Sequence, residues 1–214
     1  MTDDREELAR RQFDQSTANH EMRVLHEDGV YRHVRFAQPG RHSWSYLYDL
    51  VTWPGHLSIS GDLESYTFRR TTDMFTFFNE PTLDRINPHY WGEKLVAPRG
   101  RDAVRVYVPE LVEARLNEWV ADQAEHYDCE GEELASLRDA VRDLVRWNSD
   151  IEWSEDAARS AIRDFEHRGR SIYDPSEWSF RDWDHHFLTA CWAIKRGVER
   201  YWAHIGGSQG ADRG

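Results

Sequence analysis

The sequence has little cysteine and no long apolar run. Its two cysteines, Cys129 and Cys191, are far apart and lack metal-ligand spacing, so free thiols in a reducing compartment are expected rather than a disulfide. No apolar run approaches the roughly 20 residues that a membrane-spanning helix requires. Residues 1–7 lack the basic and apolar regions of a secretory signal. These absences predict a cytoplasmic protein that is not anchored in a membrane.

Motifs of catalysis and cofactor binding are also absent from the sequence. There is no Walker A sequence, no G-x-G-x-x-G after a predicted strand and no H-E-x-x-H. The 11 histidines include no pair at H-x-x-x-H spacing, so no metal site is predicted. His56, Ser58 and Ser60 alternate along one predicted strand, but neighbours on a strand face lie about 7 Å apart, too far for a reliable hydrogen bond between nucleophile and base. We therefore predict no catalytic residue and no cofactor.

The net charge of −12 is concentrated in one segment. Residues 110–156 carry 15 acidic and 4 basic side chains (−11), whereas residues 1–109 carry 16 and 14, and residues 157–214 carry 8 and 9. Such a field repels nucleic-acid phosphates and favours a basic partner protein, although a solvated helical face is the simpler interpretation. The carboxylates that we select as candidate binding residues in this segment are Glu132, Glu133, Asp139 and Asp143.

Alternating apolar and polar residues predict an antiparallel sheet in the N-terminal half of the chain. A hairpin is expected over residues 22–36, around the turn signal Asp28-Gly29. The stretch from residue 44 to residue 72 alternates in the same way and breaks at Pro54-Gly55 and at Gly61-Asp62. Together these segments predict a meander of four to five strands.

Helical spacing of apolar residues dominates the second half of the chain. Three helices are predicted after Pro109, followed by a last helix over about residues 181–205. The predicted fold is therefore α+β: an N-terminal antiparallel sheet of four to five strands packed with short helices, then a C-terminal helical bundle of about four helices. The predicted division is a sheet region over residues 1–100, a helical region over residues 101–206 packed on it, and a disordered tail over residues 207–214.

A second candidate site lies in the sheet region. Arg70 stands close to Tyr66 and Phe68, and a basic residue beside aromatic rings is suited to contact a phosphate or a nucleic acid. An ion pair at the edge of the sheet explains the same residues. His33, His56, Asp62 and Arg70 would form the site of a small enzyme or of a nucleotide-binding protein if strand pairing brought them together, which the sequence does not decide.

Several strings in the sequence resemble a known family. They are HEMRVLHEDGVYRHVRF (20–36), DLVTWPGHLSISGD (49–62), YTFRRTTDMFTFF (66–78), INPHYWGEKL (86–95) and CWAIKRGVERY (191–201). Together they resemble a family of uncharacterised proteins encoded by tailed bacteriophages and prophages. No shared motif is found between about residues 97 and 179. The resemblance implies a phage or prophage origin, an accessory protein that is not part of the virion, and a location in the cytoplasm of the host cell. The resemblance implies no specific activity for this chain.

These observations lead to two expectations of function. The first is a phage-type accessory protein that is not an enzyme and binds a host or phage macromolecule through its acidic helical face, its sheet face, or both. Mimicry of DNA against a host defence protein is one form of this role, because clustered carboxylates can imitate phosphates. The alternative is the small enzyme or nucleotide-binding protein whose site would contain His33, His56, Asp62 and Arg70. We expect a host or phage protein as the partner in preference to directly bound nucleic acid. The oligomeric state is not predicted.

Overall fold

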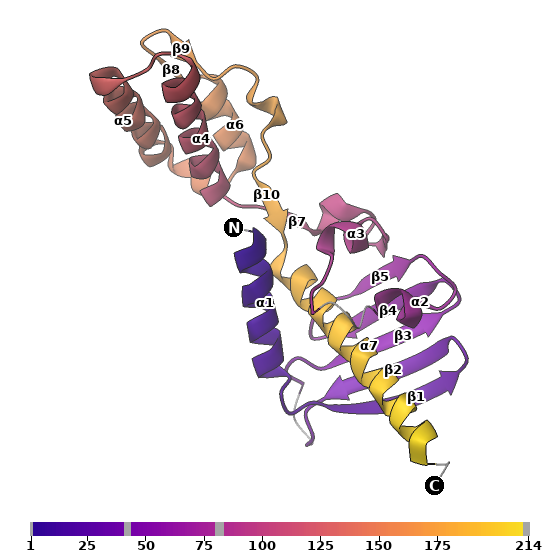
Figure 1. Cartoon of the computed structure of the whole chain (residues 1–214). Helices are drawn as coiled ribbons and strands as arrows, with labels where there is room; N and C mark the ends of the chain where they lie inside the picture. The colour runs from indigo at the N-terminus through magenta and orange to yellow at the C-terminus, as the bar shows by residue number, and fades with distance from the viewer. Residues whose placement is uncertain (1, 41–43, 80–83, 212–214) are drawn as a thin grey trace. The chain divides into compact units, whose positions relative to one another are not determined.

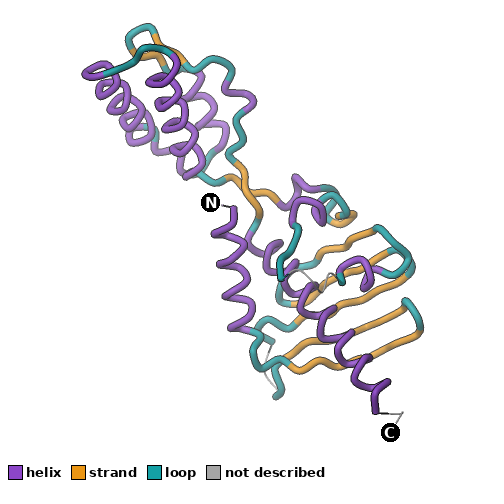
Figure 2. Tube along the Cα trace, viewed as in Figure 1, coloured by secondary structure: helices purple, strands orange, loops and turns teal. Residues whose placement is uncertain are grey.

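The computed structural model describes residues 2–40, 44–79 and 84–211. The chain divides into a sheet unit, residues 1–105 and 183–214, and a helical unit, residues 106–182. Figure 1 labels the α-helices and most strands of each unit, and Figure 2 shows that the long strands all belong to the sheet unit. The predicted α+β class, with an antiparallel sheet followed by helices, is confirmed.

Six strands form the main sheet in chain order, and each neighbouring pair is antiparallel. They are β1 (Glu21–Asp28), β2 (Tyr31–Ala37), β3 (Tyr48–Trp53), β4 (His56–Gly61), β5 (Tyr66–Arg69) and β6 (Leu95–Ala97). The prediction of four to five strands is wrong, because the sheet has a sixth strand, β6. With only three residues, β6 is too short to show a two-residue period.

Helices of the sheet unit cover one face of this sheet. They are α1 (Thr2–Ser16), α2 (Met74–Phe78), α3 (Pro88–Gly92), the 3₁₀ helix η1 (Arg101–Val104) and α7 (His185–Ala211). α7 runs across the strands (Figure 1), and its Phe187 packs against Tyr66 and Phe68 of β5. The sheet unit therefore has one core between α7 and the sheet. No helix in the described part of the chain has both the length and the apolar character needed to cross a membrane.

The helical unit has its own core. Its elements are α4 (Glu110–His126), α5 (Gly131–Trp147), η2 (Ser149–Glu152), α6 (Glu155–Arg163), β8 (Glu166–His167), β9 (Arg170–Ser171) and η3 (Pro175–Glu177). Val112 and Leu116 of α4, Leu137 of α5, and Ala158 and Ile162 of α6 are fully buried together. The four-residue spacing within each helix places these side chains on one face, which explains why three helices suffice for a core.

The last helix does not belong to the helical unit. The predicted helical region over residues 101–206 included it, whereas α7 is part of the sheet unit and residues 106–182 contain three α-helices rather than about four. The chain passes between the units in β7 (Arg105–Tyr107) and β10 (Arg181–Trp183), which pair with each other. The predicted tail over residues 207–214 is described only in part: the backbone is helical to Ala211, and residues 212–214 lie outside the described residues.

Candidate binding groove in the helical unit

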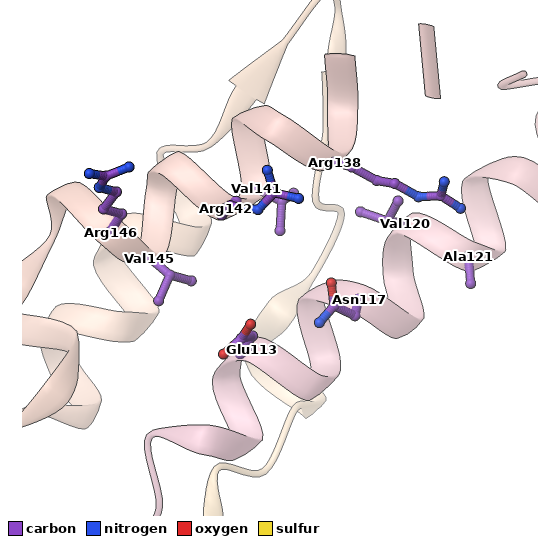
Figure 3. A pocket seen from close by; sticks show the side chains of 9 residues that line it. All are labelled: Glu113, Asn117, Val120, Ala121, Arg138, Val141, Arg142, Val145 and Arg146. Carbon is purple, nitrogen blue, oxygen red and sulfur yellow. The ribbon is translucent and has the colours of Figure 1, made fainter. Parts of the chain in front are cut away.

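An open groove of about 500 Å³ runs between α4 and α5 of the helical unit (Figure 3). It is lined by Glu113, Asn117, Val120, Ala121, Arg138, Val141, Arg142, Val145 and Arg146. Val120 and Val141 are each only 3% exposed and form its apolar floor. The groove continues into a second hollow of about 370 Å³, which shares Glu113, Val145 and Arg146 with the first. The two hollows therefore adjoin one another at these three residues.

The spacing of residues in the two helices produces this groove. In α4 the buried positions 112, 116 and 120 are each followed by a position that lines the groove, at 113, 117 and 121. In α5 the buried positions 137 and 141 are followed in the same way by 138 and 142. One residue turns a helix by about 100°, so a second stripe on each helix faces away from the core contacts with α6.

Three arginines form one rim of the groove. Arg138, Arg142 and Arg146 lie four residues apart on α5, so successive side chains start about 6 Å apart along the helix axis. Residues 110–156 contain only four basic side chains, and these are three of them. Arg142 Nη1 donates to Asp139 Oδ1 at 2.9 Å, and the Arg146 guanidinium lies 5.3 Å from the ring centre of the exposed Trp147. Arg138 makes no hydrogen bond or ion pair with any residue that the structure describes.

The opposite rim of the groove is acidic and polar. Glu113 and Asn117 line the groove from α4, and Figure 3 shows the Arg138 side chain reaching from α5 over Val120. Glu113 is exposed and forms no ion pair within the described residues. A ligand in the groove therefore meets positive charge on one side, negative charge on the other and apolar surface beneath. This arrangement suits a ligand that carries both signs of charge, because each rim presents charged or polar groups of a different kind.

The carboxylates selected from the sequence lie beside this groove and not within it. Helix geometry places Glu132, Asp139 and Asp143 within about 40° of one another around α5, on the stripe next to the arginines. Glu133 lies on a different side of the helix and accepts a hydrogen bond from Arg170 Nε at 2.9 Å. The four candidates therefore do not form a single acidic surface.

The four candidates in the sheet region do not come together either. His56 begins β4 and Asp62 follows its last residue, which separates them by about 20 Å along the strand. Arg70 lies at the same end as His56, where its backbone N–H donates to Gly55 O at 3.1 Å. His33 is on β2, two strands away from β4. These positions give no support to a shared catalytic or nucleotide site.

Each histidine of that set has a local structural partner. The His56 ring stacks on Trp53, with 4.9 Å between ring centres. His33 Nε2 lies 3.2 Å from Asp49 Oδ2, and Arg35 donates two hydrogen bonds of 2.8 Å to the same carboxylate. Burial by itself raises the pKa of Asp49, but the bonds from Arg35 and His33 outweigh it and hold that pKa below its ordinary value. Among the described residues, no three His, Cys, Asp or Glu side chains are grouped to hold a metal ion.

The arginine row could have been predicted from the sequence. Counting charges by segment does not detect it, because the count ignores where each residue lies around the helix. Arg138, Arg142 and Arg146 repeat every four residues within a predicted helix, and such a repeat places side chains on one face. Summing the charge of residues 110–156 treats these arginines as a small correction to −11. Sorting the charges by their position around each helix separates the arginine row from the carboxylates.

Comparisons of the chain with protein-family models, with curated proteins and with solved structures found no match.

Proposed function

We propose that this protein is a binding protein without enzymatic activity, and that it holds a partner protein in the groove between α4 and α5. One observation carries this proposal: three arginines at four-residue spacing border an open floor of valines. Guanidinium groups form strong, directional hydrogen bonds with carboxylates. Apolar surface next to such groups is the usual composition of a protein-binding surface.

The charge of the helical unit favours a protein over a nucleic acid. Residues 106–182 carry 20 acidic and 9 basic side chains, a net charge of −11. Binding to nucleic acid depends on neutralising a continuous row of phosphates, and a surrounding field of this sign opposes it. A partner protein can place a few carboxylates on the arginine row and keep the rest of its charge elsewhere.

The wider role is proposed on the resemblance alone. A phage-encoded accessory protein that takes over a host process or blocks a host defence would need such a binding surface. The origin, the location in the host cytoplasm and the DNA-mimicking form of this role stay predictions. The proposed groove differs from the acidic surface that the sequence favoured, so an experiment has to separate the two.

Affinity capture with two matched variants makes this separation. The tagged protein is incubated with a lysate of its bacterial host, beside Arg138→Gln/Arg142→Gln/Arg146→Gln and the control Glu132→Gln/Asp143→Asn, which keeps the partner of Arg142. Arginine and glutamine have similar helix propensities, so the first variant keeps the fold, which circular dichroism verifies.

The proposal requires a host protein that the parent retains and the arginine variant loses. The control with neutralised carboxylates must retain it as well. Retention by the arginine variant together with loss by the control would refute the groove and restore the acidic surface. Equal retention by all three proteins would refute both.

A further inference from the structure

We infer that the occupant of the groove is an amphipathic helix with carboxylates at four-residue spacing along one flank and basic or amide side chains along the other. This inference rests on the proposed function, since it names the kind of protein segment that the same groove receives. Its basis is the match between the groove's two rims and floor and the three stripes of such a helix.

The repeat of the arginines fits a helical partner. Arg138 and Arg146 are eight positions apart on α5, with Arg142 midway, which is about 12 Å along the helix axis. A second helix that lies nearly parallel to α5 repeats its own side chains every four residues with the same rise, so three carboxylates at positions i, i+4 and i+8 align with the three guanidinium groups.

The apolar floor argues against an extended segment. Alternate side chains of a strand also repeat at about 7 Å, close to the arginine spacing. A strand must, however, pair its backbone N–H and C=O groups, and the floor presents the side chains of Val120, Val141 and Val145 instead. A helix satisfies its own backbone hydrogen bonds and needs only apolar contact from the floor.

The second rim determines the other flank of the helix. Glu113 and Asn117 line the first hollow, and Glu110 and Glu113 line the second. A lysine or arginine on the partner would face these carboxylates, while its own carboxylates face α5. A helix with both flanks occupied carries little net charge, so the negative field of the helical unit does not repel it.

Two synthetic helical peptides of identical composition test this inference. Both have 18 residues with leucine at core positions. The segregated peptide carries glutamate along one flank and lysine along the other, and the mixed peptide alternates glutamate and lysine on both flanks. The mixed pattern is the right control because reversing the direction of a segregated helix merely exchanges its flanks, whereas a mixed helix cannot match the two rims in either direction.

Fluorescence anisotropy of the labelled peptides with the full chain gives the affinities. We expect the segregated peptide to bind about tenfold tighter than the mixed one, a difference of about 1.4 kcal/mol. This preference should disappear in Arg138→Gln/Arg142→Gln/Arg146→Gln and persist in Glu132→Gln/Asp143→Asn, which leaves the Arg142–Asp139 ion pair intact. It should also shrink as NaCl is raised from 50 to 500 mM, because salt screens exposed charge pairs.

The opposite outcomes are equally definite. Equal affinity for the two peptides, or no binding of either at 100 µM, would overturn the inference of a two-flanked helix. If the arginine variant still lost a captured host protein in that case, the proposed function would stand and only the nature of the occupant would be wrong. If capture did not depend on the arginines, the proposed function itself would fail.

Discussion

Arg32 connects the sheet to two helices, and its contacts define a test of what holds the sheet unit together. Its guanidinium donates to both carboxylate oxygens of Asp73, at 2.9 and 3.0 Å, and its Nε donates to the Tyr201 hydroxyl at 3.1 Å. The same guanidinium lies 5.2 Å from the ring centre of Phe75 and 5.9 Å from that of Trp202. Strand β2, the start of α2 and the helix α7 therefore meet at one cation.

The two members of this ion pair should not contribute equally to stability. The Arg32 side chain is 7% exposed, whereas that of Asp73 is 25% exposed and also accepts from the backbone N–H of Phe75 at 2.9 Å. Asp73→Ser keeps a residue that can cap α2 but leaves a buried cation without its counter-ion, which costs about 3–5 kcal/mol. Arg32→Met leaves a carboxylate that water and the helix start still solvate, so we expect about 1–3 kcal/mol.

Urea unfolding followed by circular dichroism measures the free energy of unfolding of both variants and of the double variant. The double variant should be more stable than the sum of the two losses predicts, because it removes the cation and the carboxylate together. The reasoning would be refuted if Arg32→Met cost more than Asp73→Ser, or if the two losses were additive within about 0.5 kcal/mol.

Three further predictions concern the core and its titration. Gly197→Ala should lower the free energy of unfolding by about 1 kcal/mol, because its Cβ would lie 2.7 Å from Leu50 Cδ1 and overpacking outweighs the gain in helix propensity; a stabilised variant would contradict this in the same urea assay. Burial lowers the pKa of His20, so the unfolded chain binds the proton more tightly and stability falls as the pH drops below about 6.5. The decrease in melting temperature between pH 7.5 and pH 5.5 should therefore be smaller in His20→Gln, and an unchanged decrease would rule out His20 as its source. Cys129 and Cys191 are fully buried, so a thiol reagent should label neither in the folded protein and both in 6 M urea, and labelling before unfolding would show that the core opens.

Local patterns in the sequence were sufficient to predict most strands of the sheet. Val34, Leu50, Leu57 and Ile59 occupy alternate positions in their strands and are fully buried, because a two-residue period places them all on the face that α7 covers. The Asp73 carboxylate also acts locally, because it accepts from two backbone N–H groups at the start of α2, the helix that follows it directly. Such features depend on residues that are neighbours in the chain.

Features that depend on distant residues could not be predicted in this way. The period of the last helix describes an apolar stripe on α7, but the stripe does not identify the surface that it packs against. Gly197 marks that surface, because a Cβ at this position would crowd Phe36 and Leu50. The sequence alone offers no reason to pair a glycine near the C-terminus with strands β2 and β3. The position of His33 relative to His56 likewise follows from strand pairing, whereas the separation of His56 and Asp62 follows from their spacing along β4.

The acidic segment and the arginine row act over different distances, which makes them compatible. The Debye length at physiological ionic strength is about 8 Å, so a carboxylate within hydrogen-bonding reach of Arg138 responds to the row far more strongly than to the net charge of the unit. A long polyanion extends beyond the 12 Å of the row and meets the surrounding carboxylates, among them Glu132 and Asp143. If the groove binds as proposed, an arginine row within an acidic surface should therefore favour short, patterned sets of carboxylates over nucleic acids. The same row on a neutral surface would bind both.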